Sequence, residues 1–96
     1  MTTQAMQRDS EVFRVEIAEG DGLFIAQSKD LPGLFVADKT LDAVVNSIPG
    51  VIKVILKVKR DLDYYVLKAR IQDDHQRAWV AIPAFIAEKA FVGAHA

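Results

Sequence analysis

Residues 40–60 read TLDAVVNSIPGVIKVILKVKR, and their pattern decides the fold. Large aliphatic side chains recur every three or four residues, which predicts an amphipathic helix with one apolar stripe. The stripe consists of Leu41, Val44, Val45, Ile48, Ile52, Ile55 and Leu56. Thr40 can accept a hydrogen bond from the free amides of the first turn, and late basic residues complement the negative end of the helix dipole. Pro49 and Gly50 interrupt the sequence but not the phase of the stripe, so we expect a kink or a restart within one element.

Three short strands are predicted before the helix. Residues 13–18 alternate apolar side chains with polar or small ones, the period of a strand with one wet face. Residues 19–22 contain two glycines and favour a tight hairpin, after which residues 23–28 resume an extended pattern. Residues 29–33, KDLPG, place proline and glycine as a type II turn requires. Residues 34–37 then form the third strand.

The chain returns to strand-like patterns after the helix. In residues 64–71 the odd-numbered apolar positions alternate with basic ones, which predicts a fourth strand. Residues 72–77 are polar and predict a turn, and residues 78–82 could fold back beside the fourth strand as a fifth. Pro83 suits the first position of a short C-terminal helix.

These elements predict an α+β fold built on a β-β-β-α-β unit of the partial ribonuclease H-like type. Consecutive strands joined by short turns pair as neighbours, whereas the fourth strand is reached through the helix and must cross the sheet. A right-handed crossover would place it parallel to the first strand, which gives the sheet order 3-2-1-4 with the helix on one face. The C-terminal strand and helix are possible additions to this unit.

Composition indicates one soluble domain. The 96 residues are 51% hydrophobic and 26% charged, so we expect a single folded core over residues 11–96, with an extension from about residue 72 and a disordered N-terminus over residues 1–10. A net charge of −1 argues against binding nucleic acid through the overall field of the protein. The absence of cysteine excludes disulfides, thiolate metal sites and cysteine nucleophiles. No secretion signal or apolar span is evident, so we expect a cytoplasmic protein that is not bound to a membrane.

A family resemblance rests on the order of the elements, the glycine hairpin and two sequence motifs. The motifs are Ala26-Gln27-Ser28-Lys29-Asp30-Leu31-Pro32-Gly33-Leu34 and Asp38-Lys39-Thr40-Leu41-Asp42. Over Phe13 to about Ile71 the chain resembles the HicB-like antitoxin domain of toxin-antitoxin systems. The resemblance implies a non-catalytic protein that binds and neutralises a small RNA-cleaving toxin, or an orphan oligomeric relative. Members of the family often repress their own operon through a DNA-binding tail. Residues 72–96 depart from that pattern, because they leave room for one strand and one short helix rather than a complete ribbon-helix-helix.

The candidate interface consists of Asp30, Leu31, Pro32, Gly33, Trp79 and Phe85. The first four residues form the most specific motif of the resemblance. The other two are aromatic, and aromatic residues anchor interfaces because they bury a large area at low entropic cost. Trp79 could equally complete the core. Open sheet edges require cover, and pairing through the strand at residues 78–82 would produce a homo-oligomer.

The alternatives are a metal-dependent nuclease of ribonuclease H-like fold and a DNA-binding autorepressor. A nuclease needs several carboxylates around divalent metal ions. Glu16 and Asp42 could contribute, but the fourth strand carries Lys68 and Arg70 where another acid is required. His75 stands beside two aspartates in a turn and is interpreted as a loop residue. We therefore predict no catalytic, cofactor-binding or metal-binding residue and no cofactor. The basic residues Lys53, Lys57, Lys59, Arg60, Lys68 and Arg70 are interpreted mainly as a wet surface rather than a nucleic-acid footprint.

Overall fold

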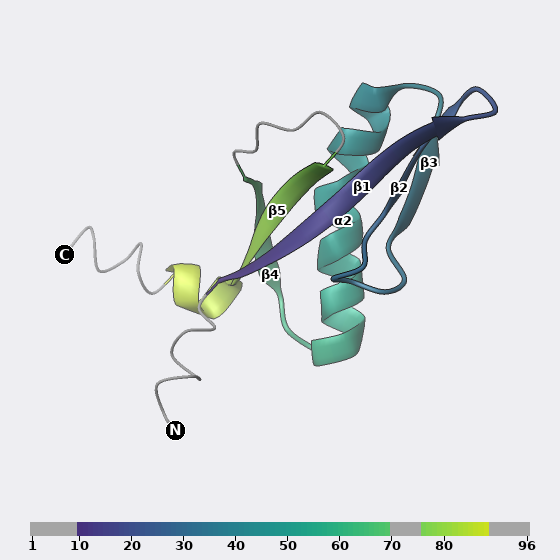
Figure 1. The fold of residues 1–96 in the computed structure, drawn as a ribbon. Coiled ribbons are helices and arrows are strands. Elements are labelled where there is room, and N and C mark those ends of the chain that lie inside the picture. The colour runs from purple at the N-terminus through teal and green to yellow at the C-terminus, as the bar shows by residue number, and fades with distance from the viewer. Residues whose placement is uncertain (1–9, 70–75, 89–96) are drawn as a thin grey trace.

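The computed structural model describes residues 10–69 and 76–88, which form a five-stranded sheet with one long helix lying against it (Figure 1). The predicted disordered N-terminus lies outside the described residues, apart from Ser10. The elements are β1 (Glu11–Gly20), β2 (Leu23–Gln27), β3 (Phe35–Asp38), α2 (Leu41–Arg60), β4 (Tyr64–Lys68) and β5 (Gln76–Pro83). Residues 84–88 are helical and follow β5 directly. The predicted α+β class is confirmed, and the predicted C-terminal helix begins one residue after Pro83.

The strand order is β3-β2-β1-β5-β4, and every neighbouring pair is antiparallel. The predicted order 3-2-1-4 is therefore correct for β3, β2 and β1 but wrong for the strand next to β1, which is β5 rather than β4. Because β5 is antiparallel to both β1 and β4, those two strands still run in the same direction, as a crossover requires. They are not neighbours, because β5 folds back from β4 and occupies the position beside β1. Local hydrophobic patterns do not encode this insertion.

The two reversals before the helix form as their glycines predict. Asp21 and Gly22 join β1 to β2 with φ values of 55° and 77°, and Gly20 pairs with Leu23 across the turn. Two consecutive positive φ values define the type I′ hairpin that matches the twist of antiparallel strands. Gly33 has a φ of 98°, and the amide of Leu34 donates to the carbonyl of Leu31 at 3.2 Å. This confirms the predicted type II turn.

Helix α2 is continuous for 20 residues. The Thr40 hydroxyl accepts the amide of Ala43 at 3.1 Å, which confirms the predicted N-terminal cap. At the other end, Asp61 adopts a left-handed conformation and its amide donates to the carbonyl of Lys57 at 2.8 Å. Pro49 lies inside the helix without ending it, so the prediction of one element across the proline is confirmed, and of the two expected alternatives, a kink or a restart, the restart does not occur. The apolar stripe explains this result, because four residues on both sides of the proline pack into one core: Val44, Ile48, Ile52 and Leu56.

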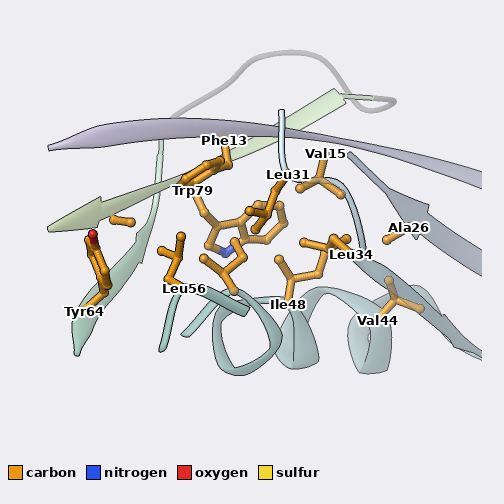
Figure 2. Close-up of a cluster of buried hydrophobic side chains, with 12 residues drawn as sticks. Phe13, Val15, Ala26, Leu31, Leu34, Val44, Ile48, Leu56, Tyr64 and Trp79 are labelled. Atoms are coloured by element: carbon orange, nitrogen blue, oxygen red, sulfur yellow. The ribbon is translucent and has the colours of Figure 1, made fainter. Parts of the chain in front are cut away.

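The core lies between α2 and one face of the sheet. β1 contributes Phe13 and Val15, while β5 contributes Trp79 and Ala81. Figure 2 shows the Trp79 side chain projecting from β5 toward the helix, beside Phe13 and Leu31. Trp79 is 1% exposed, so it completes the core, which was one of its two sequence interpretations.

Burial of a charge in this cluster should unfold the domain. Ile52 is fully buried in the middle of the stripe, whereas Val54, two residues later, is 63% exposed. We expect Ile52→Asp to lower the free energy of unfolding by about 4 kcal/mol or more, because it removes apolar contacts and buries an unpaired carboxylate. Urea denaturation followed by circular dichroism measures this change. The matched variant Val54→Asp should unfold within about 1 kcal/mol of the natural chain. Equal losses for the two variants would contradict the assigned orientation of α2.

Candidate functional site

The loop after β2 is fastened to β1 by two polar side chains. The backbone of β1 pairs with β2 from Glu16 onward, and Arg14 lies just before that ladder begins. There the Asp30 carboxylate accepts the Arg14 amide at 2.8 Å, and the Ser28 hydroxyl donates to the Arg14 carbonyl at 2.5 Å. The two side chains therefore supply the hydrogen bonds that another strand residue would have made.

Ser28 also organises the loop itself. Its hydroxyl oxygen accepts the amides of Asp30 at 3.1 Å and Leu31 at 3.2 Å. This local bonding turns the chain so that Leu31 and Leu34, each 3% exposed, enter the core. Lys59 of α2 donates to the Pro32 carbonyl at 3.2 Å and connects the outer side of the loop to the helix.

The predicted interface residues therefore have different positions. Leu31 and Trp79 do come together, but inside the hydrophobic core. Asp30 and Pro32 lie on the surface, where they make the bonds described above, and Gly33 is exposed in the turn. Phe85, in the helical segment after β5, is 60% exposed. The most specific motif of the sequence, Asp30-Leu31-Pro32-Gly33, thus has a role in folding, because it fastens the loop to β1 and places Leu31 in the core.

The Ser28 and Asp30 bonds should contribute measurably to stability. We expect Ser28→Ala and Asp30→Ala each to lower the free energy of unfolding by about 1 to 3 kcal/mol, because they leave backbone groups of β1 without protein partners. Asp30→Asn should cost less, since its amide oxygen can still accept the Arg14 amide. Chemical denaturation provides the measurement, and Lys29→Ala is the control within the same loop. An equal loss for Lys29→Ala would show that the loop is merely sensitive to substitution.

The acidic residues considered for a nuclease do not converge. Glu16 is exposed on β1, and Asp42 is exposed in the first turn of α2. Across residues 10–69 and 76–88, no three histidine or carboxylate side chains lie close enough to share a metal ion. His75 and Arg70 lie outside the described residues. The helix-start position of Asp42 gives it a role in helix stability through the dipole.

The face of the sheet away from α2 carries an apolar row that the sequence did not reveal. Val80 of β5 lies opposite Val12 of β1 on one side and Leu67 of β4 on the other. Residues directly opposite in antiparallel strands share a face, and alternate residues such as Trp79 point to the helix. Val12 is 53% exposed and Leu67 58% exposed. Two residues further along β4 and β5, Tyr65 and Ile82 form another pair on the same face.

We call these five residues the outer patch: Val12, Tyr65, Leu67, Val80 and Ile82. The alternation within residues 64–71 had indicated that Tyr65 and Leu67 form the apolar face of β4. The structure instead turns Tyr64 and Val66 toward the helix, with Tyr64 only 7% exposed. Hydrophobicity alone did not distinguish the two faces, because both are apolar. The signal that identifies the patch is the register of β5, which is a property of the assembled sheet.

An ion pair near one end of the sheet closes the core beside Tyr64. Arg60 donates to both carboxylate oxygens of Glu11, at 2.7 and 3.3 Å, and to the Tyr64 hydroxyl at 3.2 Å. Its guanidinium carbon also lies 5.9 Å from the centre of the Tyr64 ring. The hydrogen bonds to Glu11 and then Tyr64 raise the pKa of Arg60 above its usual range. Arg60, one of the six basic residues that the sequence analysis interpreted as a wet surface, therefore joins α2 to β1.

Tyr65 links the outer patch to the helical segment after β5. Its hydroxyl donates to a Glu88 carboxylate oxygen at 3.1 Å. The hydrogen bond and the negative charge of Glu88 raise the pKa of the Tyr65 phenol, because ionisation would remove the donor and place two anions together. The bond fixes Glu88 beside β4.

Substitution of Glu88 should change the titration of Tyr65. We expect Glu88→Gln to lower the Tyr65 pKa toward the ordinary tyrosine value of about 10, since the neutral amide does not repel the phenolate. The pKa is raised in the folded state, so the stabilising contribution is present below the unfolded pKa and is lost as pH rises through the folded pKa. Ultraviolet absorbance of the phenolate measures the titration, with Tyr64→Phe in both samples so that one tyrosine remains. An unchanged pKa would mean that the bond is not formed in solution.

No protein family, curated protein or solved structure matches this chain in comparisons with known proteins. No helix among the described residues is long and apolar enough to span a membrane.

The strand at residues 78–82 cannot support the predicted self-association through an open edge. It belongs to β5, whose two edges pair with β1 and β4. The open edges of the described sheet are β3 and β4. Homo-oligomerisation stays a prediction, but this particular route is wrong because the strand is internal.

Proposed function

We propose that this protein is a non-catalytic binding module that holds a small protein partner on its outer patch, in the manner of the HicB-like antitoxins it resembles. The observation that carries the proposal is the row formed by Val12, Val80 and Leu67 on the face of the sheet away from α2. Helix α2 covers only the opposite face. Exposed apolar patches of this kind are characteristic of protein interaction sites.

The surroundings of the patch fit a protein ligand. Tyr65 offers both an aromatic ring and a hydroxyl, a combination that is enriched at interfaces. Charged residues of opposite sign stand around the apolar centre, with exposed Arg14 two residues beyond Val12 and Glu88 bonded to Tyr65. An apolar centre with a mixed polar rim favours a partner surface of the same composition.

The β4 edge offers a second means of recognition beside the patch. The amide of Ala69 donates to the carbonyl of Ala78, and the amide of Ala84 donates to the carbonyl of Asp63. The backbone N–H and C=O groups of the odd-numbered residues of β4 therefore point toward β5. The even-numbered residues Tyr64, Val66 and Lys68 direct their backbone groups toward the open edge. A strand of the partner can pair there while its side chains contact Leu67 and Tyr65.

Binding to a defined partner tests the proposal. The product of the neighbouring gene, co-expressed with this chain and purified as a complex, is the partner of first choice because the resemblance implies a toxin encoded alongside. We expect Leu67→Asp to weaken the complex about thirtyfold or more in titration calorimetry, because a charge replaces an apolar anchor.

The control is Val58→Asp, which introduces the same charge at a 79% exposed position of α2. It should leave the dissociation constant within about twofold, since surface changes away from an interface have small effects. Loss of binding in Val58→Asp with retention in Leu67→Asp would move the interface to the helix and overturn the assignment of the outer patch. A neighbouring product that does not bind the natural chain would remove the proposed function itself.

A further inference from the structure

We propose that, when no partner is bound, the open edge of β4 pairs with the same edge of a second copy of this chain. The two strands run antiparallel about a two-fold axis at Val66. The occupant of the edge is thus an identical strand, Tyr64–Lys68 of the second copy. The inference goes beyond the proposed function, because the dimer needs no partner. A partner strand on the β4 edge would exclude the second copy, so the two uses of the edge alternate.

The backbone of β4 has the alternation that this pairing requires. Its odd-numbered residues bond to β5, as the amide of Ala69 does to the carbonyl of Ala78 at 2.9 Å. The N–H and C=O groups of Tyr64, Val66 and Lys68 point instead toward the open edge. An axis at Val66 places that residue opposite its own copy and places Tyr64 opposite Lys68 of the second copy. Each of these pairs can exchange both backbone hydrogen bonds, because all of their members point outward.

The side chains on the outer face complement themselves in this register. Tyr65 lies opposite Leu67 of the second copy, and Leu67 lies opposite Tyr65 of the second copy. Directly opposite aromatic and aliphatic side chains stabilise antiparallel strands, and these two are 43% and 58% exposed, so both have apolar area to bury. The outer patch also becomes continuous, because the row Val12, Val80 and Leu67 extends into Tyr65 and Ile82 of the second copy.

Charge and strand length select the same register. Lys68 is the only charged residue of β4, and two lysines directly opposite each other would repel. With the axis at Val66, Lys68 stands opposite Tyr64 of the second copy instead. An axis at Tyr65 or Leu67 would leave one of the three outward residues without an opposite residue in β4. The axis at Val66 therefore uses the whole strand and keeps the lysines apart.

Sedimentation velocity of the natural chain over a concentration series measures the self-association. We expect a monomer–dimer equilibrium without larger species, because a two-fold pairing uses the edge of both copies. Leu67→Asp should raise the dissociation constant of the dimer about tenfold or more, since the change occurs twice and places a carboxylate opposite each Tyr65.

Val12→Asp is the matched control for Leu67→Asp. Val12 is 53% exposed on the same face of the sheet, but it lies on β1, two strand positions away from β4. The control should leave the dissociation constant within about twofold. Circular dichroism of both variants verifies that the fold is retained.

Disulfide formation between introduced cysteines measures the register. The chain has no cysteine of its own, so each variant carries a single thiol. In an equimolar mixture of Tyr65→Cys and Leu67→Cys, the disulfide between unlike chains should exceed each disulfide between like chains about fivefold or more. The reason is that opposite residues at these positions have Cα atoms about 4.5 Å apart. Two copies of one position are displaced by a further step of about 7 Å along the strands, beyond the reach of a disulfide.

Phe35→Cys provides the control for collisions between exposed thiols. Phe35 is 59% exposed, close to the 58% of Leu67, but it lies on β3 at the opposite edge of the sheet. A mixture of Phe35→Cys and Leu67→Cys should show no excess of the disulfide between unlike chains.

A natural chain that stays monomeric at every concentration would overturn the proposal. Equal weakening by Val12→Asp and Leu67→Asp would place the second copy face to face on the outer patch and would overturn it as well. Disulfides between like chains that equal the disulfide between unlike chains would contradict the axis at Val66. The complex with a partner gives a contrasting result, because Val12→Asp should weaken it while the dimer stays intact. Failure of the dimer and failure of the proposed function are therefore distinguishable.

Discussion

The packing of four helical residues against one face of the sheet is the constraint on which the rest of the structure depends. Val44, Ile48, Ile52 and Leu56 follow one another at intervals of four and are all fully buried. Side chains four apart lie along one side of a helix, so a single helix covers a single sheet face. The stripe maintains α2 through Pro49, even though proline removes a backbone donor there and costs about 3 kcal/mol in a helix interior. Helix α2 does not cover the other face of the sheet, which carries the outer patch.

The last strand completes both surfaces at once. β5 enters between β1 and β4, brings Trp79 into the core and places Val80 on the opposite face. Its pairing with β1 joins residues sixty or more positions apart, such as Phe13 and Trp79. Such distant pairing has a large cost in loop entropy before its contacts form. The outer patch therefore exists only in the fully assembled sheet, which links any function of this face to complete folding.

Local chemistry was readable from the sequence, and long-range pairing was not. Thr40 capped the helix, Gly22 formed the hairpin and Gly33 formed the type II turn, because each acts on bonds within a few residues. The position of β5 could not be predicted in the same way, since residues 78–82 are compatible with pairing to β4 alone or to β1 as well. The same limitation concealed the candidate site. Val12, Leu67 and Val80 come from three separate segments, and only the register brings them into a row. The motif Asp30-Leu31-Pro32-Gly33 was predicted to form part of an interface. In the structure, however, Ser28 and Asp30 bind the backbone of β1 and Leu31 enters the core.

The outer patch presents exposed side chains on strands whose register is fixed by the core. Each member of its central row has a chain neighbour that belongs to the core or packs against it: Val12 precedes Phe13, Val80 follows Trp79, and Leu67 follows the partly buried Val66. A shift of one residue in any of these strands would turn core residues to water, so the core holds the register of the row. The outward side chains themselves make little of that core, as the exposure of Val12 and Leu67 shows. Substitutions on this face should therefore leave the fold largely constant, so the binding that we propose for the outer patch can be altered separately from the core.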